Sequence, residues 1–220
     1  SKLPSEPRRL VIVMTGPRED ISWTSVDAKL MDFFDLKGVV DEMLTGLHIE
    51  GVEYTPAQHP SFHPGRCASV GTHEQPSLYG ILGELHPMVR EAYKLPQHAV
   101  IAVDIDLEEL FASMPSVYTT RGLSRYPAIV EDIALIVEDS LPAARVEALI
   151  RKTGGRQLIT AQLFDVYRGS QVGDGRKSIA YRLTYQSDVK TLTDRDVAIL
   201  RKKIVSRLEG DLGAELREGK

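Results

Sequence analysis

Residues 163–186 read LFDVYRGSQVGDGRKSIAYRLTYQ, in which two alternating segments flank a glycine-rich turn at 170–175. In the first segment, Phe164 and Val166 alternate with Asp165 and Tyr167. The second segment alternates four larger apolar residues with smaller or polar ones: Ile179, Tyr181, Leu183 and Tyr185 against Ser178, Ala180, Arg182 and Thr184. Because successive side chains of a strand point to opposite faces, this stretch predicts a β-hairpin with one apolar and one polar face.

The polar face of this hairpin carries Asp165, Tyr167, Ser178 and Arg182. Such a face is either a binding surface or simply the solvated side that many antiparallel sheets have. The alternation alone favours the solvated alternative. A stronger argument comes from the elements that surround the hairpin.

Those elements alternate between strands and helices. Strands are predicted over 128–137 and 214–217, and a helix over 140–153. A second helix is predicted from an N-cap at Thr193 to about Glu209, ended by Gly210 and Gly213. With hairpin strands at 158–168 and 177–186, the order is βαββαβ, which is ferredoxin-like. Each helix has one apolar stripe, so both cover the same sheet face, and RNA-binding modules of this architecture use the open face.

Composition describes an ordinary soluble globular chain of one or two domains, with 220 residues, 42% hydrophobic and 26% charged. No segment approaches the roughly 18–20 apolar residues of a membrane span. The polar start, SKLPSEPRRL, has no signal-peptide pattern. The single cysteine, Cys67, excludes an intramolecular disulfide framework and a multi-cysteine zinc site. We therefore expect a cytoplasmic protein without a membrane partner.

The charges are distributed unequally along the chain. Residues 1–118 hold 9 Lys and Arg against 17 Asp and Glu, whereas residues 119–220 hold 18 against 14. Residues 112–123, ASMPSVYTTRGL, lack periodicity and predict a linker. We expect two domains, 1–118 and 119–220, and the basic excess of the second permits a nucleic-acid role.

The first domain is predicted to be α+β with several antiparallel strands. Predicted strands cover 9–14, 53–56, 67–71, 79–85 and 99–105, predicted helices cover 27–47, 88–93 and 107–111, and a loop rich in His and Pro covers 58–65.

Five ordered blocks stand out in the second domain: SRYPAIVEDIALIVED (124–139), LFDVYRG (163–169), GRKSIAYRLTYQ (175–186), TLTD (191–194) and GAELR (213–217). Together they resemble the ferredoxin-fold anticodon-binding domain that closes the β subunit of bacterial phenylalanyl-tRNA synthetase. The resemblance implies that the open sheet contacts the anticodon stem-loop of phenylalanine tRNA through flat or hydrogen-bonding side chains. The candidate tRNA-binding residues are Arg125, Asp132, Asp165, Tyr167, Ser178 and Arg182.

One position departs from the family pattern. The family usually has Arg-Asp in the first strand of this domain, where this chain has Glu131-Asp132. We expect the change to reverse a charge on or near the open sheet, and to weaken any phosphate contact at position 131.

Three blocks of the first domain resemble the catalytic-like module that precedes that domain in the same subunit: DFFDLKG (32–38), HPGRCA (63–68) and GILGELHP (80–87). In the family this module is related to class II synthetase cores, has lost the chemistry and packs against the catalytic α subunit of an α2β2 assembly. The resemblance implies a C-terminal fragment of a β subunit that supports ATP-dependent aminoacylation without catalysing it. It implies no cofactor in the fragment, with ATP and Mg²⁺ bound through the α subunit.

The residues leave two other function classes open. A stand-alone ferredoxin-like RNA-binding or regulatory protein would share only the second domain and would lack a class II-like antiparallel sheet in residues 1–118. A metal- or thiol-dependent hydrolase would use His59, His63, His86 and Cys67. Prolines lie between these histidines and argue against a helix that aligns His59 with His63. A structural or interface role for the histidines and a packed thiol at Cys67 are therefore favoured.

Overall fold

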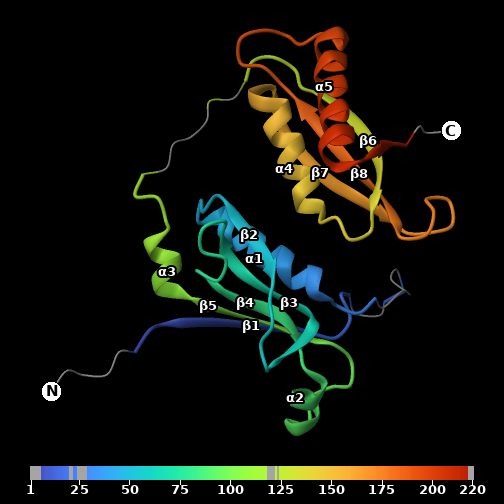
Figure 1. Cartoon of the computed structure of the whole chain (residues 1–220). Helices are drawn as coiled ribbons and strands as arrows, with labels where there is room; N and C mark the ends of the chain where they lie inside the picture. Colours follow the sequence, from blue (N-terminus) through green and yellow to red (C-terminus); the bar gives the residue numbers. More distant parts are fainter. Residues whose placement is uncertain (1–5, 20–21, 24–28, 118–121, 123, 218–220) are drawn as a thin grey trace. The chain divides into compact units, whose positions relative to one another are not determined.

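The computed structural model describes residues 6–19, 22–23, 29–117, 122 and 124–217 (Figure 1). The chain divides into two compact units, Ser1–Thr120 and Arg121–Lys220, which we call unit 1 and unit 2. Each unit combines an antiparallel sheet with helices, so the predicted α+β class is confirmed. In the described part of the chain, no helix is both long enough and apolar enough to cross a bilayer.

Unit 1 is built on a five-stranded antiparallel sheet with the order β1-β5-β4-β3-β2. Its strands are β1 Arg9–Thr15, β2 Val52–Pro56, β3 Phe62–Thr72, β4 Gly80–Leu85 and β5 Val100–Asp106. Its helices are α1 Phe33–Gly46, α2 Pro87–Ala92 and α3 Leu107–Ala112. Leu36, Val40 and Leu44 of α1 are buried against strand residues such as Leu82 and Val103, so the core lies between α1 and one sheet face.

Helix α1 begins six residues later than the predicted start at 27, because a capping box fixes its N-terminus. The Asp32 side chain accepts a hydrogen bond from the Phe34 N–H at 2.8 Å, and Asp35 accepts one from the Asp32 N–H at 2.7 Å. Residues 27–28 of the predicted helix lie outside the described residues. The predicted loop at 58–65 is also shorter than expected, because β3 begins at Phe62, which pairs with Leu85.

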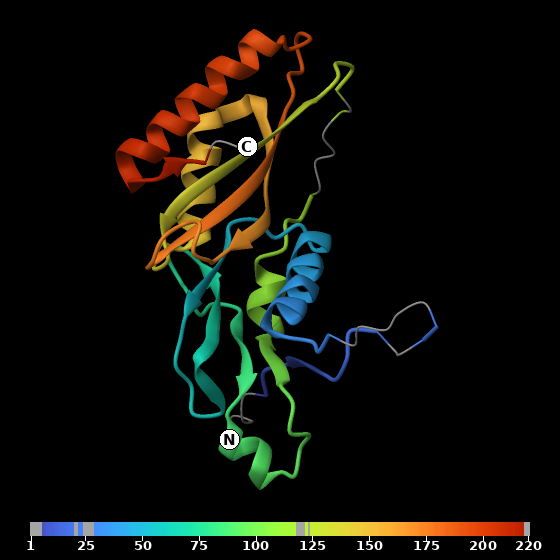
Figure 2. The same ribbon diagram turned by 90° about the vertical axis from the view of Figure 1, so that its right-hand side faces the viewer.

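Unit 2 has the predicted βαββαβ order and a four-stranded antiparallel sheet in the order β7-β8-β6-β9. Its strands are β6 Ile129–Glu138, β7 Leu158–Tyr167, β8 Arg176–Tyr185 and β9 Glu215–Leu216. Its helices are α4 Ala143–Gly154, the short 3-10 helix η1 Gly155–Gln157, and α5 Asp194–Leu212. Figures 1 and 2 show α4 and α5 on the same side of this sheet.

The apolar faces of the strands and helices of unit 2 meet in one core. All four residues predicted for the apolar face of β8 are fully buried: Ile179, Tyr181, Leu183 and Tyr185. They pack with Val146 and Ile150 of α4 and with Ile204 and Leu208 of α5. Because both helices cover this face, the polar face of the hairpin is left on the other side of the sheet.

Helix α5 begins and ends at strong capping signals. The Thr193 side chain accepts from the Asp196 N–H at 3.2 Å, and Asp196 accepts from the Thr193 N–H at 3.0 Å, which is a reciprocal capping box. The helix continues through Gly210, contrary to the prediction, and ends at Gly213, whose φ of 62° lies in the left-handed region.

The Asp196 cap makes the stability of unit 2 depend on pH. Hydrogen bonds from Thr193 and Lys190 lower the pKa of Asp196 from 3.8 to about 2. A carboxyl group with a depressed folded-state pKa stabilises the fold above its unfolded pKa, and this contribution is lost as the pH falls through the folded value. We expect Asp196→Asn to lower the urea midpoint of unit 2 at pH 7 and to have little effect at pH 2. Asp188→Asn removes the same charge from an exposed loop carboxylate and is the control; equal midpoint losses for both variants would contradict the assignment.

Candidate functional site

The face of the unit 2 sheet that points away from α4 and α5 is the candidate site, which we call the open face (Figure 2). Its residues in β6 and β8 alternate with the core residues and pair directly across the two strands: Val130 with Thr184, Asp132 with Arg182, Ala134 with Ala180, and Ile136 with Ser178. The edge strand β7 contributes four residues that pair with the same β8 positions: Thr160, Gln162, Asp165 and Tyr167. Five of the six predicted site residues therefore belong to one surface.

Arg182 and Asp132 form a two-point ion pair at the centre of the open face. Nε and Nη2 of Arg182 donate to Oδ1 and Oδ2 of Asp132 at 2.9 and 2.8 Å. These hydrogen bonds lower the pKa of Asp132 and raise that of Arg182, so both groups stay charged at neutral pH. The side chains remain about half exposed, at 52% and 45%. Paired donors fix the plane of a guanidinium, so Arg182 offers solvent a flat, oriented surface.

Phe164 lies under this guanidinium because β7 contains a bulge. Leu163 pairs with Tyr181 and Asp165 with Ala180, which leaves Phe164 as one extra residue in the strand. Phe164 is 50% exposed, and Cζ of Arg182 lies 5.2 Å from its ring centroid. The prediction that Phe164 shares an apolar face with Val166 is therefore wrong, because the bulge places its ring beside Arg182 on the open face.

A second cation–aromatic contact covers the other end of the open face. Cζ of Arg217, which follows β9, lies 5.7 Å from the Tyr167 ring centroid. Nη1 of Arg217 also donates to Oγ of Ser178 at 3.4 Å, and Nη2 donates to Gln171 at 3.2 Å. Ser178 is only 3% exposed, so Arg217 and Tyr167 form the accessible surface here. Ser178 lies on the open face as predicted, but it is buried and its hydroxyl accepts a hydrogen bond from Arg217.

Asp165 and Arg125 are exposed and unpaired. Among the described residues, neither side chain makes a hydrogen bond or an ion pair. A purely structural role for Asp165, such as a hydrogen bond to Ser178 or to a turn N–H, therefore has no support among the described residues. Asp165 is a free acceptor on the open face, and Arg125 is a free cation just before β6.

Glu131 lies on the opposite side of the sheet from Asp132. It pairs with the buried Leu183, and its Oε2 is 3.9 Å from Nε of Arg201 on α5. Burial, reinforced by the charge of Glu131, raises the pKa of Tyr185 to about 12. The expectation that Glu131 changes the charge on or near the open sheet is therefore wrong, because the carboxylate lies on the helix side.

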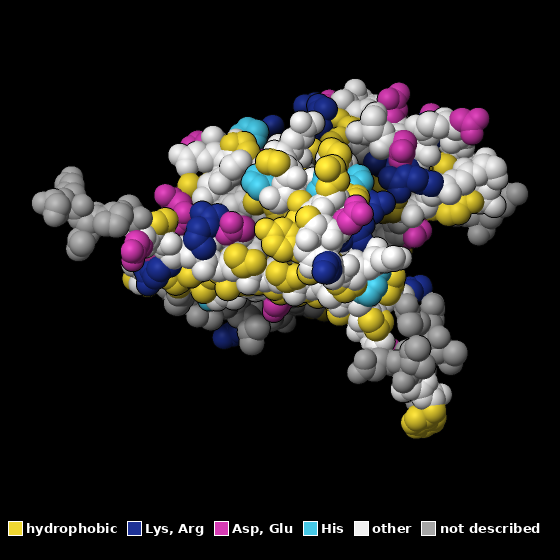
Figure 3. Space-filling model, turned by 90° about the horizontal axis from the view of Figure 1, so that it is seen from below, with side chains coloured by type: hydrophobic (Ala, Val, Ile, Leu, Met, Phe, Trp, Pro, Cys, Tyr) yellow, Lys and Arg dark blue, Asp and Glu magenta, His cyan; other side chains and the backbone are white. Residues whose placement is uncertain are grey.

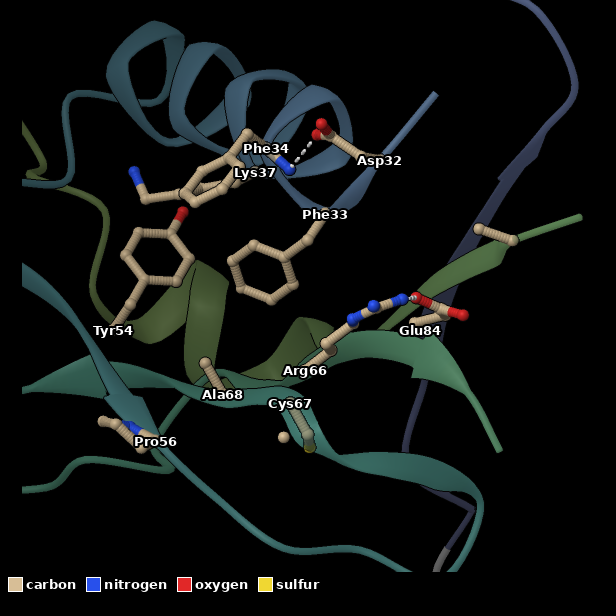
Figure 4. Close-up of a pocket in the computed structure, with 12 residues that line it drawn as sticks. Asp32, Phe33, Phe34, Lys37, Tyr54, Pro56, Arg66, Cys67, Ala68 and Glu84 are labelled. Carbon is tan, nitrogen blue, oxygen red and sulfur yellow. Dashed lines mark hydrogen bonds and ion pairs between the residues drawn. The ribbon is translucent and has the colours of Figure 1, made fainter. Parts of the chain in front are cut away.

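Unit 1 contains a cavity of about 690 Å³ beside the N-terminus of α1. Figure 4 shows the Phe33 ring pointing into it between Tyr54 and Arg66. Arg66 pairs with the buried Glu84 at 2.5 Å, and burial raises the pKa of the nearby Cys67 thiol. A buried thiol with a raised pKa holds little reactive thiolate at neutral pH, so the cavity does not provide an activated nucleophile.

Two other polar side chains that line this cavity, those of Lys37 and Tyr54, are hydrogen-bonded to Asp41. Asp41 accepts from Nζ of Lys37 at 2.5 Å and from the Tyr54 hydroxyl at 2.6 Å. Nζ of Lys37 also lies 4.3 Å from the Tyr54 ring centroid. This network orients Lys37 and Tyr54 on the wall of the cavity.

The three histidines of the proposed hydrolase site each accept a backbone N–H through Nδ1. The donors are Ser61 for His59 at 3.2 Å, Gly65 for His63 at 3.1 Å, and Met88 for His86 at 3.2 Å. Figure 3 shows histidines among hydrophobic side chains on the surface of the molecule. Within the described ranges, no group of three or more His, Cys, Asp or Glu side chains is arranged to hold a metal ion. These contacts are structural, and they give the hydrolase alternative no support.

Phe164 and Arg217 make the cation–aromatic contacts of the open face, and neither of them was predicted for this face from the sequence. Phe164 was missed because strict alternation assumes regular pairing, and no residue in LFDVY marks the bulge. Arg217 closes the block GAELR, and its position after a short strand beside β6 was the available signal. The position of Glu131 was predictable, since it shares the parity of the core residues Ile133 and Leu135.

Both units match known families. Residues 1–107 match the family described as "Phenylalanyl tRNA synthetase beta chain CLM domain". Residues 124–217 match the family described as "Ferredoxin-fold anticodon binding domain".

Curated relatives cover both units in one alignment. The chain is 39% identical over 216 residues to the phenylalanine–tRNA ligase beta subunit of Symbiobacterium thermophilum. This alignment covers 98% of this chain and 24% of that protein. It is 39% identical over 216 residues to the Lactiplantibacillus plantarum beta subunit, covering 97% of this chain and 26% of that protein. The Shewanella oneidensis beta subunit is 35% identical over 209 residues, and the alignment covers 94% of this chain and 25% of that protein. The chain thus spans about a quarter of the length of these relatives.

Proposed function

Because the chain belongs to the family of phenylalanine–tRNA ligase β subunits, we propose that unit 2 binds the anticodon region of phenylalanine tRNA on its open face. The observation that carries this proposal is the pair of cation–aromatic contacts, Arg182 with Phe164 and Arg217 with Tyr167, exposed on one uncovered sheet. Unpaired bases of RNA loops stack on aromatic rings and guanidinium planes and are recognised through hydrogen bonds to their edges. Asp165, which has no partner among the described residues, is available to accept such a hydrogen bond.

The predicted site residues have different roles in this proposal. Arg182, held by Asp132, and Tyr167 provide stacking surfaces, Asp165 accepts from a base, and Ser178 becomes available when Arg217 moves. Arg125, free and exposed before β6, holds a backbone phosphate. Phe164 and Arg217 join this set.

Unit 1 has a different role. We assign residues 1–118 to a non-catalytic class II synthetase-like module that docks on the catalytic α subunit, and residues 119–220 to the anticodon-binding domain. The α subunit supplies the site for ATP and Mg²⁺ in an α2β2 assembly that aminoacylates tRNA in the cytoplasm. The support is the match of residues 1–107 to the beta-chain family and the antiparallel sheet of unit 1. A stand-alone ferredoxin-like protein is disfavoured, because relatives named beta subunit align with both units.

Titration of the chain with phenylalanine tRNA tests the proposal. We expect binding to weaken steeply as the salt concentration rises from about 50 to about 200 mM, because phosphate contacts release counterions. A tRNA with the same body and a swapped anticodon is the control, and it is expected to bind at least about 10-fold more weakly. Equal affinity for the two tRNAs would contradict anticodon recognition by the open face.

A further inference from the structure

The helical side of unit 2 carries the entire positive excess of that unit. Together, α4, η1 and α5 hold nine Lys and Arg against five Asp and Glu. Residues 121–220 as a whole hold 18 against 14, which is the same excess of four. The strands and loops of unit 2, including the open face, therefore sum to neutral.

The cations on the two sides of the sheet also differ in how they are paired. On the strands and their turns, Arg182 pairs with Asp132, Arg176 with Glu215, and Arg168 with Asp139. On the helical side, six exposed cations have no side-chain hydrogen bond or ion pair with any described residue: Arg145, Lys152, Arg156, Arg195, Lys202 and Lys203. We call these six residues the helical cations.

Four of the helical cations are evenly spaced on two adjacent helices. Arg145 and Lys152 on α4 are seven residues apart, as are Arg195 and Lys202 on α5, and α4 packs against α5. Seven residues make about two helical turns, or roughly 10.5 Å, so each pair lies along one side of its helix. The only large apolar residue of α4 and α5 that is strongly exposed is Ile199, at 62%. Protein interfaces bury an apolar or aromatic centre, which this surface lacks, whereas a regular array of free cations suits a chain of phosphates.

We infer that the helical cations form a second RNA-binding surface, which holds backbone phosphates of an RNA segment other than the one on the open face. Free, exposed Lys and Arg bind phosphate without breaking an existing ion pair, and the release of counterions favours the contact. The sheet lies between the two surfaces, so the segment that stacks on Phe164 and Tyr167 does not itself reach α4 and α5. The open face therefore supplies base recognition, and the helical side supplies attraction that is independent of sequence.

Oligouridylate binding to the full chain tests this inference. A fluorescent 12-nucleotide oligouridylate is titrated at several salt concentrations, with the open face saturated by unlabelled phenylalanine anticodon stem-loop. In the variant Arg195→Gln/Lys202→Gln/Lys203→Gln, the slope of log K against log salt is expected to become shallower by about 2, at roughly 0.7 for each lost single-strand phosphate contact. Affinity at low salt is expected to fall roughly 10-fold or more.

Two comparisons make the result specific. Arg8→Gln/Arg9→Gln/Arg18→Gln removes the same charge from ion-paired residues of unit 1 and is expected to change the slope little. The second comparison is Phe164→Ala/Tyr167→Ala, which removes both rings of the open face. If this variant binds oligouridylate with the wild-type salt slope, the binding belongs to the helical side, even if anticodon recognition itself fails.

Two outcomes would overturn the inference. One is a wild-type slope in the triple Gln variant of α5. The other is a 12-residue polyglutamate that binds as tightly as the oligouridylate, which would indicate a surface for an acidic protein instead.

Discussion

Alanine in place of Phe164 or Tyr167 is expected to weaken binding of the phenylalanine anticodon stem-loop by about 1–3 kcal/mol each, or roughly 5- to 150-fold in Kd. Each ring is exposed and supports a guanidinium, Arg182 over Phe164 and Arg217 over Tyr167. Removing the ring removes a stacking partner and also frees the arginine from its orientation. Fluorescence anisotropy with the stem-loop measures the loss, and circular dichroism of each variant checks that unit 2 is folded.

Conservative variants separate stacking from folding in this experiment. Phe164→Tyr and Tyr167→Phe keep the rings, and we expect both to bind within about 2-fold of the wild type. Val189→Ala truncates a residue that is 81% exposed in the loop before α5 and is the matched control. If both alanine variants retained wild-type affinity, bases would not stack on the open face.

Gly80→Ala is expected to destabilise unit 1 by about 3 kcal/mol, the upper end of the usual cost of overpacking. Gly80 begins β4 with a φ of 153°, and a Cβ atom there would lie 2.0 Å from the backbone oxygen of Asp104. The obstacle is backbone of β5, the interior strand that pairs with β4, so relief requires β4 and β5 to separate. Urea unfolding followed by hydrogen exchange of peptides from each unit measures the effect, because the two units need not unfold together.

Gly38→Ala is the opposite-sign control for Gly80→Ala. Gly38 lies inside α1, and a Cβ atom there would meet no other atom within 4 Å. Glycine inside a helix costs roughly 0.5–1 kcal/mol relative to alanine, so this variant is expected to stabilise unit 1 by about that amount. The effect of a glycine-to-alanine substitution on stability thus differs in sign between two positions of unit 1. Neither variant is expected to change the stability of unit 2. Destabilisation by both variants alike would refute the steric argument.

Much of unit 2 could be predicted because its residues alternate or repeat regularly. The alternation of Ile179, Tyr181, Leu183 and Tyr185 predicted a buried face, and all four side chains are fully buried. Thr193 predicted the start of α5, because an N-cap uses only a few neighbouring residues. These features depend on local chemistry, which a single sequence displays directly.

The misplaced features depend on pairing between segments or on competing local signals. The start of α1 was predicted too early because apolar spacing continued across the capping box of Asp32 and Asp35. The face of Phe164 was wrong because the bulge is a property of β7 and β8 together. The hydrogen bond from Arg217 to Ser178 joins the end of the last strand to the hairpin, and residue periodicity and composition carry no information about that contact.

The extra residues of β7 have a consequence for comparing this hairpin with others. Leu158 pairs with Tyr185 and Thr160 with Thr184, so Ile159 is a second extra residue, five positions before Phe164. A hairpin with regular pairing needs a one-residue gap opposite each of them to be aligned correctly. Without these gaps, positions 160–163 are matched to residues on the wrong side, and the positions after Phe164 are matched to residues displaced by two along the strand. Substitution patterns for Asp165 and Tyr167 are therefore meaningful only between homologous hairpins of equal strand length, or after such gaps have been introduced.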